Sequence, residues 1–342
     1  MRDGIDISVV IPVFNAEDTL VRTVDSVLLQ EGCSFEVILV DDGSTDGSGD
    51  LCDEIASREE CVRVIRKTNG GVSSARNAGI KASKGSFIMF VDADDMIKPG
   101  TFRKMYEPGC DFIIAGFEKV VAGKVAETYR PVAGVFSGEK EIAGFLDKTM
   151  TEKECYLINS PCFKLFRRSI LEHRSISFVE GLSYAEDKVF VMTYLTEVSS
   201  VKSVSEIVYS YILKKGSLSW DMKSDRHLSQ VFLLLDNYSR LLPSLEKCYP
   251  ASKRIAALYH NDLISRYVCR ILTVLSTHRS ALLTKENVRL LYRYMDSDKS
   301  LGTFSLRLGQ LPNVILYKIG SAGLTTVFYR LTSSVCSLFN GK

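Results

Sequence analysis

The sequence lacks the features that mark several large classes of protein. None of its apolar runs reaches the roughly 18 residues that cross a membrane as a helix. Its nine cysteines form no C-x-x-C pair, and its four histidines are scattered. A spanning helix, a disulfide framework and a cysteine-based zinc site are therefore not expected. The first residues also lack a signal-peptide pattern, because Asp6 interrupts their apolar run, so we expect a cytoplasmic protein.

Three motifs of nucleotide and metal enzymes are also missing. No G-x-G-x-x-G follows the first apolar run, and neither a P-loop nor H-E-x-x-H occurs, which argues against a Rossmann dinucleotide fold, a P-loop enzyme and a zinc protease. The 43 Lys and Arg nearly balance the 41 Asp and Glu, for a net charge of +2. That balance argues against a nucleic-acid binder, which usually has a strong basic excess.

What the chain does have is a globular composition, 46% hydrophobic and 25% charged, over 342 residues. That length suggests two domains of about 100–200 residues each. The charge is unevenly spread: residues 1–219 carry 26 basic and 33 acidic side chains, net −7, and residues 220–342 carry 17 and 8, net +9. No acidic residue follows Asp298.

Apolar runs alternate with helical patterns over the first 120 or so residues. Strands are predicted at 7–11, 35–40, 62–65 and 86–91, and helices at 17–30, 46–56 (capped by Ser44 or Thr45) and 72–83. Such alternation predicts βαβ units, hence an α/β fold with a mostly parallel sheet flanked by helices. Further strands are predicted at 111–117 and 201–211, and a helical region from about 222 onward, with the boundary at Lys214–Ser217.

Polar motifs follow each of the first four predicted strands. They are Pro12-Val13-Phe14-Asn15, Asp41-Asp42-Gly43-Ser44, Asn69-Gly70-Gly71 and Asp92-Ala93-Asp94-Asp95. In an open α/β sheet, ligands bind outside the carboxyl ends of the strands. The motifs therefore predict one site at this edge.

Asp92 and Asp94 can both reach one hard cation, and Asp95 adds charge beside them. Mg²⁺ and Mn²⁺ prefer such oxygen ligands and are often completed by substrate phosphates. A solvated acidic turn is the alternative, but clustered carboxylates repel one another unless a cation is present. We therefore favour a metal site.

Asp41 and Asp42 can accept a nucleobase N–H, which is a discriminating contact; helix capping is the alternative. Gly70 and Gly71 permit close backbone approach at a helix N-terminus, which favours anions. Arg76 lies one turn into that helix. A glycine-rich turn before a surface helix is the alternative there.

Taken together, four segments resemble the family 2 glycosyltransferases, which have the GT-A fold. In order and spacing they are Ser8–Asn15, Val40–Asp46, Asn69–Gly79 and Phe90–Asp95, so the resemblance covers roughly residues 5–100. It implies a nucleotide-diphospho-sugar donor, commonly UDP-linked, and a divalent metal, Mn²⁺ or Mg²⁺.

By position, the resemblance assigns roles at this edge. Pro12, Phe14 and Asn15 would line the nucleotide pocket, with Phe14 in place of the more usual tyrosine. Asp41, followed by Asp42, would bind the base, with Arg76 beside Asp41. Asp92 would lie near the ribose and metal, and Asp94 would hold the metal on the diphosphate.

The resemblance also implies an inverting reaction with one general base, typically in a Glu-Asp pair well after the D-x-D. Glu186-Asp187 fits, with Asp187 as the base and Glu186 orienting it or the acceptor; an exposed helix start is the alternative. Asn159–Phe166 resembles the acceptor wall, and Tyr209–Tyr211 with Gly216–Ser219 resembles a strand and a loop that closes over the diphosphate. The Q-x-x-R-W signature of processive synthases is missing, which favours transfer of one sugar per encounter.

The sequence thus predicts a metal-dependent, hexosyl-transferring GT-A domain at 1–219 and a helical C-terminal region at 220–342. The acceptor would be a hydroxyl of a glycan or a lipid-linked acceptor in the synthesis of surface polysaccharide or glycoconjugate. A sugar nucleotidyltransferase and a non-catalytic scaffold relative are the alternatives. The basic C-terminal region predicts peripheral binding to the anionic inner face of the membrane; packing on the catalytic domain or a homodimer contact is the alternative.

Overall fold

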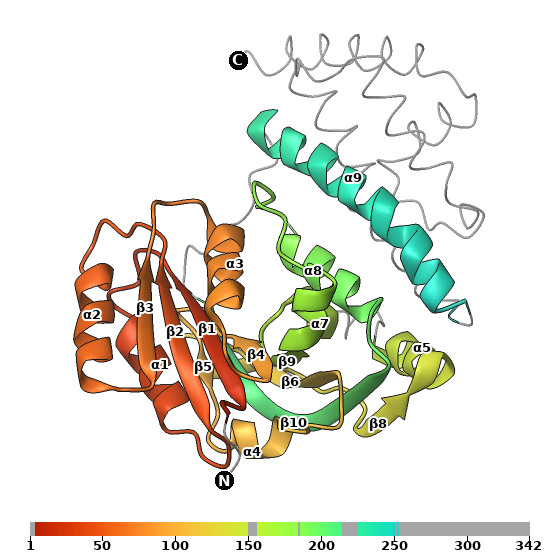
Figure 1. Ribbon diagram of the computed structural model, residues 1–342, viewed down its shortest axis with the longest axis horizontal. Helices are drawn as coiled ribbons and strands as arrows, with labels where there is room; N and C mark the ends of the chain where they lie inside the picture. The colour runs from red at the N-terminus through yellow and green to blue at the C-terminus, as the bar shows by residue number, and fades with distance from the viewer. Residues whose placement is uncertain (1–3, 150–155, 184, 214–224, 251, 253–342) are drawn as a thin grey trace. The chain divides into compact units, whose positions relative to one another are not determined.

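The computed structural model describes residues 4–149, 156–183, 185–213, 225–250 and 252. The chain divides into two units, one of residues 1–217 with 244–252 and one of 218–243 with 253–342. The boundary predicted at Lys214–Ser217 falls outside the described residues. A single sheet organises the first unit (Figure 1).

Four parallel strands form the first half of this sheet, in the order β3-β2-β1-β4. They are β1 (Ile7–Val13), β2 (Phe35–Asp41), β3 (Val62–Arg66) and β4 (Phe87–Phe90). The predicted strands are confirmed. The continuous apolar runs of β1, β2 and β4 have the expected cause, since helices cover both faces and nearly all successive side chains are buried, whereas the edge strand β3 is mostly half-buried.

Helices α1 (Leu20–Leu28) and α2 (Ser48–Arg58) lie on one side of these strands and α3 (Val72–Ala82) on the other (Figure 1). Helix α3 packs closely because Gly79 has no Cβ; one built there would meet Val10 Cγ1 at 2.2 Å. The predicted cap of α2 is wrong. Gly47 is the N-cap, and the Ser48 N–H donates instead to Asp46 Oδ1 at 3.0 Å.

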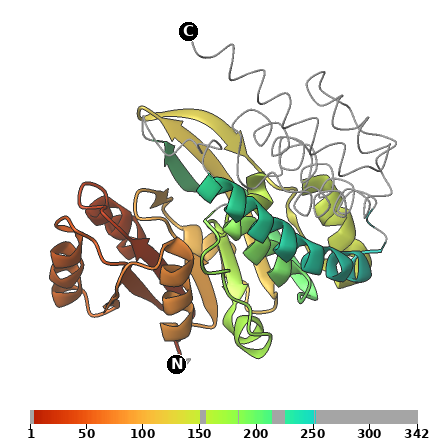
Figure 2. The ribbon, with the colours of Figure 1, turned by 90° about the horizontal axis from the view of Figure 1, so that it is seen from above.

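The second half of the sheet is mixed, with the order β9-β6-β10-β5 beyond β4. Its strands are β5 (Met96–Ile97), β6 (Phe112–Val121), β7 (Lys124–Tyr129), β8 (Gly134–Ser137), β9 (Lys164–Arg167) and β10 (Ser200–Leu213). Only β6 and β10 run parallel here, and Figure 2 shows this half beside the first. The predicted strands at 111–117 and 201–211 are confirmed and prove longer.

Short helices join these strands, and the sequence pattern did not resolve them. They are α4 (Thr101–Met105), α5 (Gly138–Thr149), α6 (Tyr156–Asn159), α7 (Arg168–His173) and α8 (Glu186–Leu195). Phe90 of β4 connects the two halves, because its ring packs edge-on against Phe166, Phe178 and Phe190. The core is therefore continuous across the sheet.

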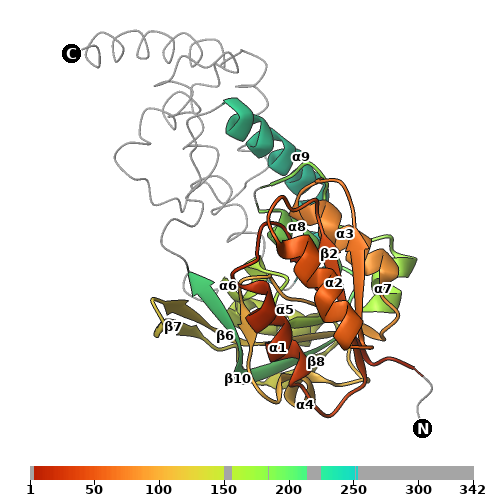
Figure 3. The same ribbon diagram turned by 90° about the vertical axis from the view of Figure 1, so that its left-hand side faces the viewer.

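Helix α9 (Asp225–Cys248) follows, as the helical spacing predicts (Figure 3). The rest of the predicted helical region lies outside the described residues. Within the first unit, the Tyr249 hydroxyl donates to Leu195 O. Among the helices that are described, none is both long and apolar enough to cross a membrane.

Candidate active site

A buried arginine joins two carboxylates that are distant in sequence. Arg76 of α3 donates from Nη1 to Asp187 Oδ1 at 2.6 Å and from Nη2 to Asp92 Oδ1 at 2.8 Å. Asp187 is in the first turn of α8 and Asp92 directly follows β4, so the contact brings together the predicted base and the predicted D-x-D motif. Only 3% of the Arg76 side chain is exposed, which makes both ion pairs short and poorly screened.

The environment of Asp187 suits a group that exchanges a proton near neutral pH. Burial raises the pKa of Asp187 to about 7; the charges of Glu186 and Asp92 add to that rise, and Arg76 opposes it. Burial also raises the pKa of Glu186. A carboxyl with a pKa near the working pH is an effective general base.

Arg76 does not lie where the sequence analysis placed it. The expected neighbour was Asp41, but the ion-pair partners of the guanidinium are Asp92 and Asp187, and its face lies 5.2 Å from the centre of the Phe178 ring. This pairing of Arg76 with Asp187 crosses 111 residues of sequence, which no local spacing could have indicated. The Nε of Arg76 is buried and makes no hydrogen bond within the described part of the chain.

The three aspartates after β4 have different roles. Asp95 is fully buried, and its carboxylate accepts from the Tyr209 hydroxyl at 2.7 Å and from the Ile212 N–H at 2.8 Å. Burial, followed by the charge of Asp92, raises the pKa of Asp95 to about 8. Asp95 therefore anchors β10 to this loop.

Asp92 and Asp94 remain as hard oxygen donors for a cation. The Asp92 side chain is 31% exposed and Asp94 is half-buried. Within the described residues, no group of three or more His, Cys, Asp or Glu could enclose a metal. The donor set thus fits a divalent cation whose remaining ligands are diphosphate oxygens and water.

Asp42 holds the glycine loop before α3. Its carboxylate accepts from Lys67 Nζ, from the Gly70 N–H at 3.0 Å and from the Gly71 N–H at 2.7 Å. Asp41 is buried and accepts from the Ser44 N–H at 3.0 Å. Both carboxylates therefore shape the edge where the nucleotide is predicted to bind.

The residues after β1 reach the same edge. Pro12 is within β1, and the Phe14 ring beyond it is 50% exposed. Asn15 has a left-handed φ of 50°, and its Oδ1 accepts from the Thr45 N–H at 2.8 Å. This bond ties the loop after β1 to the loop after β2, beside the exposed ring of Phe14.

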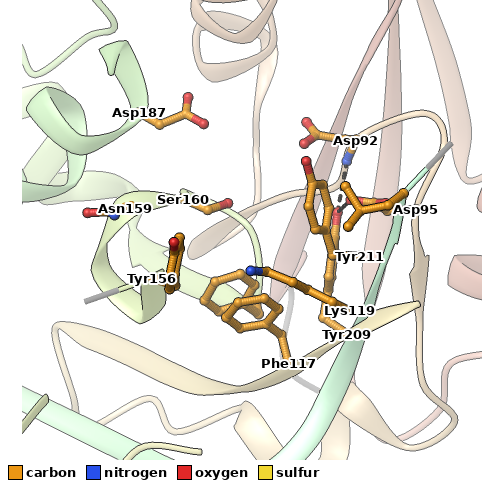
Figure 4. A pocket seen from close by; sticks show the side chains of 12 residues that line it. Asp92, Asp95, Phe117, Lys119, Tyr156, Asn159, Ser160, Asp187, Tyr209 and Tyr211 are labelled. Atoms are coloured by element: carbon orange, nitrogen blue, oxygen red, sulfur yellow. Dashed lines mark hydrogen bonds between the residues drawn. The ribbon is translucent and has the colours of Figure 1, made fainter. Parts of the chain in front are cut away.

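A cavity of about 320 Å³ opens beside the two carboxylates (Figure 4). The described residues that line it are Asp92, Asp95, Phe117, Lys119, Tyr156, Asn159, Ser160, Phe163, Asp187, Tyr209, Tyr211 and Leu213. Asn159, Ser160 and Phe163 belong to the segment expected to form the acceptor wall, and Tyr209 and Tyr211 belong to the expected late strand. The loop predicted at Gly216–Ser219 lies outside the described residues.

Two lysines support this cavity: Lys164 lies within the segment expected to form the acceptor wall, although no role was assigned to it, and Lys119 was missed by the sequence analysis. Lys164 is fully buried and donates to Ser160 O at 2.5 Å and Cys162 O at 3.3 Å, which folds the wall around its ammonium group. Burial lowers the pKa of Lys164 well below its usual range. Lys119 projects into the cavity from β6. Its only signal in the sequence is that it lies two residues after Phe117, and therefore on the same face of the strand.

With this geometry established, the chain can be compared with known proteins. The profile of the family described as glycosyl transferase family 2 matches residues 8–175. The chain is 33% identical over 239 residues to the uncharacterized glycosyltransferase EpsJ of Bacillus subtilis, covering 66% of this chain and 67% of that relative. It is 29% identical over 260 residues to a poly(ribitol-phosphate) beta-glucosyltransferase of Bacillus spizizenii, covering 72% of this chain but only 37% of that relative.

A solved structure has the same fold. The crystal structure of S. aureus TarS 1-349 in complex with UDP-GlcNAc matches with a TM-score of 0.64 and 18% sequence identity. The match covers 98% of this chain and 92% of that one. It supports the GT-A-type α/β architecture predicted from the sequence.

Proposed function

The chain belongs to glycosyl transferase family 2, and on that premise we propose that it moves one sugar from a UDP-linked donor to a hydroxyl of a glycan, with inversion at the anomeric carbon. The observation that carries this proposal is the Arg76 bridge, because it unites Asp187 with Asp92 at the mouth of one cavity. The UDP-GlcNAc named in the TarS complex supports a UDP-linked donor.

We assign the donor to the edge formed by the loops after β1, β2 and β4. Phe14 would cover the base, and the loops held by Asn15, Asp41 and Asp42 would shape its pocket. Asp92 and Asp94 would hold Mn²⁺ or Mg²⁺ on the diphosphate, and such a cation would neutralise the negative charge of the departing UDP.

Asp187 would then act as the base. Arg76 contacts its Oδ1, so Oδ2 is the oxygen assigned to the acceptor hydroxyl. As the hydroxyl oxygen bonds to the anomeric carbon, its proton passes to Asp187 and the bond from that carbon to the UDP oxygen breaks. Arg76 fixes the orientation of Asp187, and Glu186 is half-buried beside it and helps keep its pKa high.

A donor screen tests the proposal most directly. The full chain is heated with Mn²⁺ and a panel of UDP-, GDP-, CMP- and dTDP-linked sugars, because a ligand of the folded state raises the midpoint of unfolding. We expect a rise with UDP-sugars and slow Mn²⁺-dependent release of UDP. If only nucleotides with another base protect the fold, the assignment of UDP is wrong; if no nucleotide sugar does, the proposed activity is wrong.

We further propose that the acceptor is a surface polysaccharide or a lipid-linked precursor and that the enzyme works at the cytoplasmic face of the membrane. The glucosyltransferase named for poly(ribitol-phosphate) supports a polymeric acceptor, and the +9 charge of residues 220–342 supports anionic lipid as a surface for docking. Flotation with phosphatidylglycerol vesicles should weaken when residues 300–342 are deleted. Unchanged flotation after the deletion contradicts docking through residues 300–342, and a change of mass in solution instead identifies a dimer contact.

A further inference from the structure

The cavity has two chemically different ends. The carboxylates of Asp92 and Asp187 lie at one side, and Lys119, Phe117 and Tyr156 lie at the other (Figure 4). Among the described residues that line it, Lys119 is the single cation. A ligand that spans the cavity therefore meets a negative end, where the reaction is proposed, and a positive end away from it.

Two parallel strands in register build the positive end. Phe117 pairs with Tyr209 and Lys119 pairs with Tyr211, so alternate side chains of β6 and β10 share one face. Phe163 stacks on Phe117 with centroids 4.6 Å apart. Tyr129 stacks on Phe117 at the same centroid distance, so these buried rings form an apolar floor beneath the cavity but offer no free face to a sugar.

Two exposed rings border this floor. Tyr156 is 40% exposed and Tyr211 is 38% exposed, and the electron-rich face of such a ring attracts the C–H bonds of a pyranose. Asn159 Oδ1 is buried and has no hydrogen-bond partner in the described residues. This oxygen is closed to the cavity, so the two exposed tyrosine rings are the surfaces that this border offers to a ligand.

The ammonium group of Lys119 is held in place by neighbouring side chains but can still donate one more hydrogen bond. Nζ donates to the Tyr129 hydroxyl at 3.0 Å and lies 3.4 Å from Glu127 Oε2, and it is 4.2 Å from the centre of the Tyr156 ring. An ammonium has three N–H donors, and these two polar contacts leave one. Since Lys119 is 18% exposed and Glu127 is 54% exposed, the ion pair is at the solvent edge and the cation is partly withdrawn from water.

We propose that the cavity binds an acceptor sugar that carries an anionic group, a carboxylate or a phosphate, with Lys119 binding that group and the exposed rings of Tyr156 and Tyr211 holding the sugar. The proposal rests on the proposed function and adds the class of acceptor. The two ends of the cavity also orient the ligand, because the anionic group is repelled by Asp187 and attracted by Lys119. The opposite end of the acceptor then presents its hydroxyl to Asp187.

Three matched probes test the charge preference: methyl glucopyranoside, the same sugar with a 6-carboxylate, and the same sugar with a 6-phosphate. Their dissociation constants are measured by calorimetry on the full chain with UDP and Mn²⁺ present. Wild type should bind one or both charged probes more tightly than the neutral one, and the stronger of the two distinguishes a uronic acid from a sugar phosphate. Equal affinities, or binding of the neutral probe alone, overturn the proposal, as does no binding of any probe.

Lys119→Met should weaken the charged probes by about 10- to 100-fold, the usual loss for a charge-assisted hydrogen bond, and should leave the neutral probe within about 2-fold. Lys119→Arg should restore most of the loss. Lys124→Met, at an exposed position on β7, is the matched control and should behave as wild type. Equal weakening of all three probes would make Lys119 a merely structural residue.

The affinity for UDP separates this proposal from the proposed function. If Lys119→Met weakens UDP binding as strongly as probe binding, Lys119 belongs to the donor site and the proposal is wrong. If wild type turns over a UDP-sugar but shows no charge preference among the probes, only the inference about the acceptor fails. If wild type binds no nucleotide sugar, the proposed function itself fails.

Discussion

The two halves of the sheet build their parts of the site over very different distances in sequence. In the parallel half, neighbouring loops bond to each other across about the length of one βα unit, as Thr45 does with Asn15 (30 residues) and Gly70 with Asp42 (28 residues). Contacts that involve the mixed half span much more of the sequence: Arg76 of α3 reaches Asp187 across 111 residues, and Tyr209 reaches Asp95 across 114. The donor edge is thus assembled from adjacent units, whereas the reaction centre and acceptor cavity depend on the whole fold.

This difference suggests that the parallel half binds the donor and the mixed half serves transfer to the acceptor, which mutation can test. Changes at Asp94 should act on donor affinity, and changes at Asp187 should act on transfer. If the two variants had the same phenotype, the division between a donor half and an acceptor half would be wrong.

The largest effect is expected for Asp187→Asn. The amide keeps the size of the side chain but cannot take the acceptor proton, so transfer should fall by about 10²- to 10⁴-fold. The dissociation constant for UDP should change little, because the donor is proposed to bind at the loops after β1, β2 and β4 and Asp187 is not among the residues assigned to it. Steady-state UDP release with acceptor, together with calorimetry of UDP, measures both. Asp25→Asn, exposed on α1, is the control, and normal transfer by Asp187→Asn would reject Asp187 as the base.

Asp94→Ala should have the next largest effect, on the donor. Changes to groups that only support a metal ligand typically cost about 10- to 100-fold in affinity, so loss of a ligand should weaken Mn²⁺-dependent UDP binding by at least about 100-fold. Wild type treated with EDTA should match the variant. Should both retain full affinity for UDP, the metal assignment of Asp92 and Asp94 would have to be withdrawn.

The parallel half was also the part that the sequence predicted well. Strands such as Phe35–Asp41 and the polar loops after them are encoded by local runs and by spacing, and the sheet brings strand ends together by rule. The sequence could not reveal that Arg76 pairs with Asp187 and not with Asp41 as expected. Nor could it reveal that Asp95 is buried and bonded to the Tyr209 hydroxyl. Those outcomes depend on which of several carboxylates becomes buried, and burial is a property of the tertiary structure.

The mixed half resisted prediction for a related reason. Helix Tyr156–Asn159, with four residues, is too short to show a helical period, and the longer helices α5 and α8 were not identified from the sequence either. Lys119 enters the cavity only because β6 and β10 pair in parallel at one register. No local pattern sets that register. Of this end of the cavity, the sequence analysis therefore identified the segment Asn159–Phe166, by family resemblance, but not Lys119.

The pH dependence of transfer gives a smaller but diagnostic effect. Burial raises the pKa of Asp187 to about 7, so the ionised base is lost as the pH falls through that value. With acceptor below saturation, kcat/KM should be level above about pH 8 and fall about tenfold per unit below about pH 6. Asp187→Asn should show no such limb. A wild-type limb centred near the ordinary carboxyl pKa of about 4 would show that Arg76 outweighs burial.

The smallest effect concerns stability and compares the packing of the two halves. Gly79→Ala places a Cβ 2.2 Å from Val10 Cγ1 in the parallel half, so α3 must move, and we expect a loss of about 1–3 kcal/mol in the free energy of unfolding. Gly144→Ala in α5 is the matched control, since a Cβ there meets nothing within 4 Å and should stabilise the helix by about 0.5–1 kcal/mol. Urea denaturation measures both. Because Gly79 is one turn beyond Arg76, a displaced α3 should also shift the guanidinium and lower transfer, whereas Gly144→Ala should leave transfer unchanged. Equal stability of the two variants would mean that the parallel half tolerates overpacking as readily as a helix surface does.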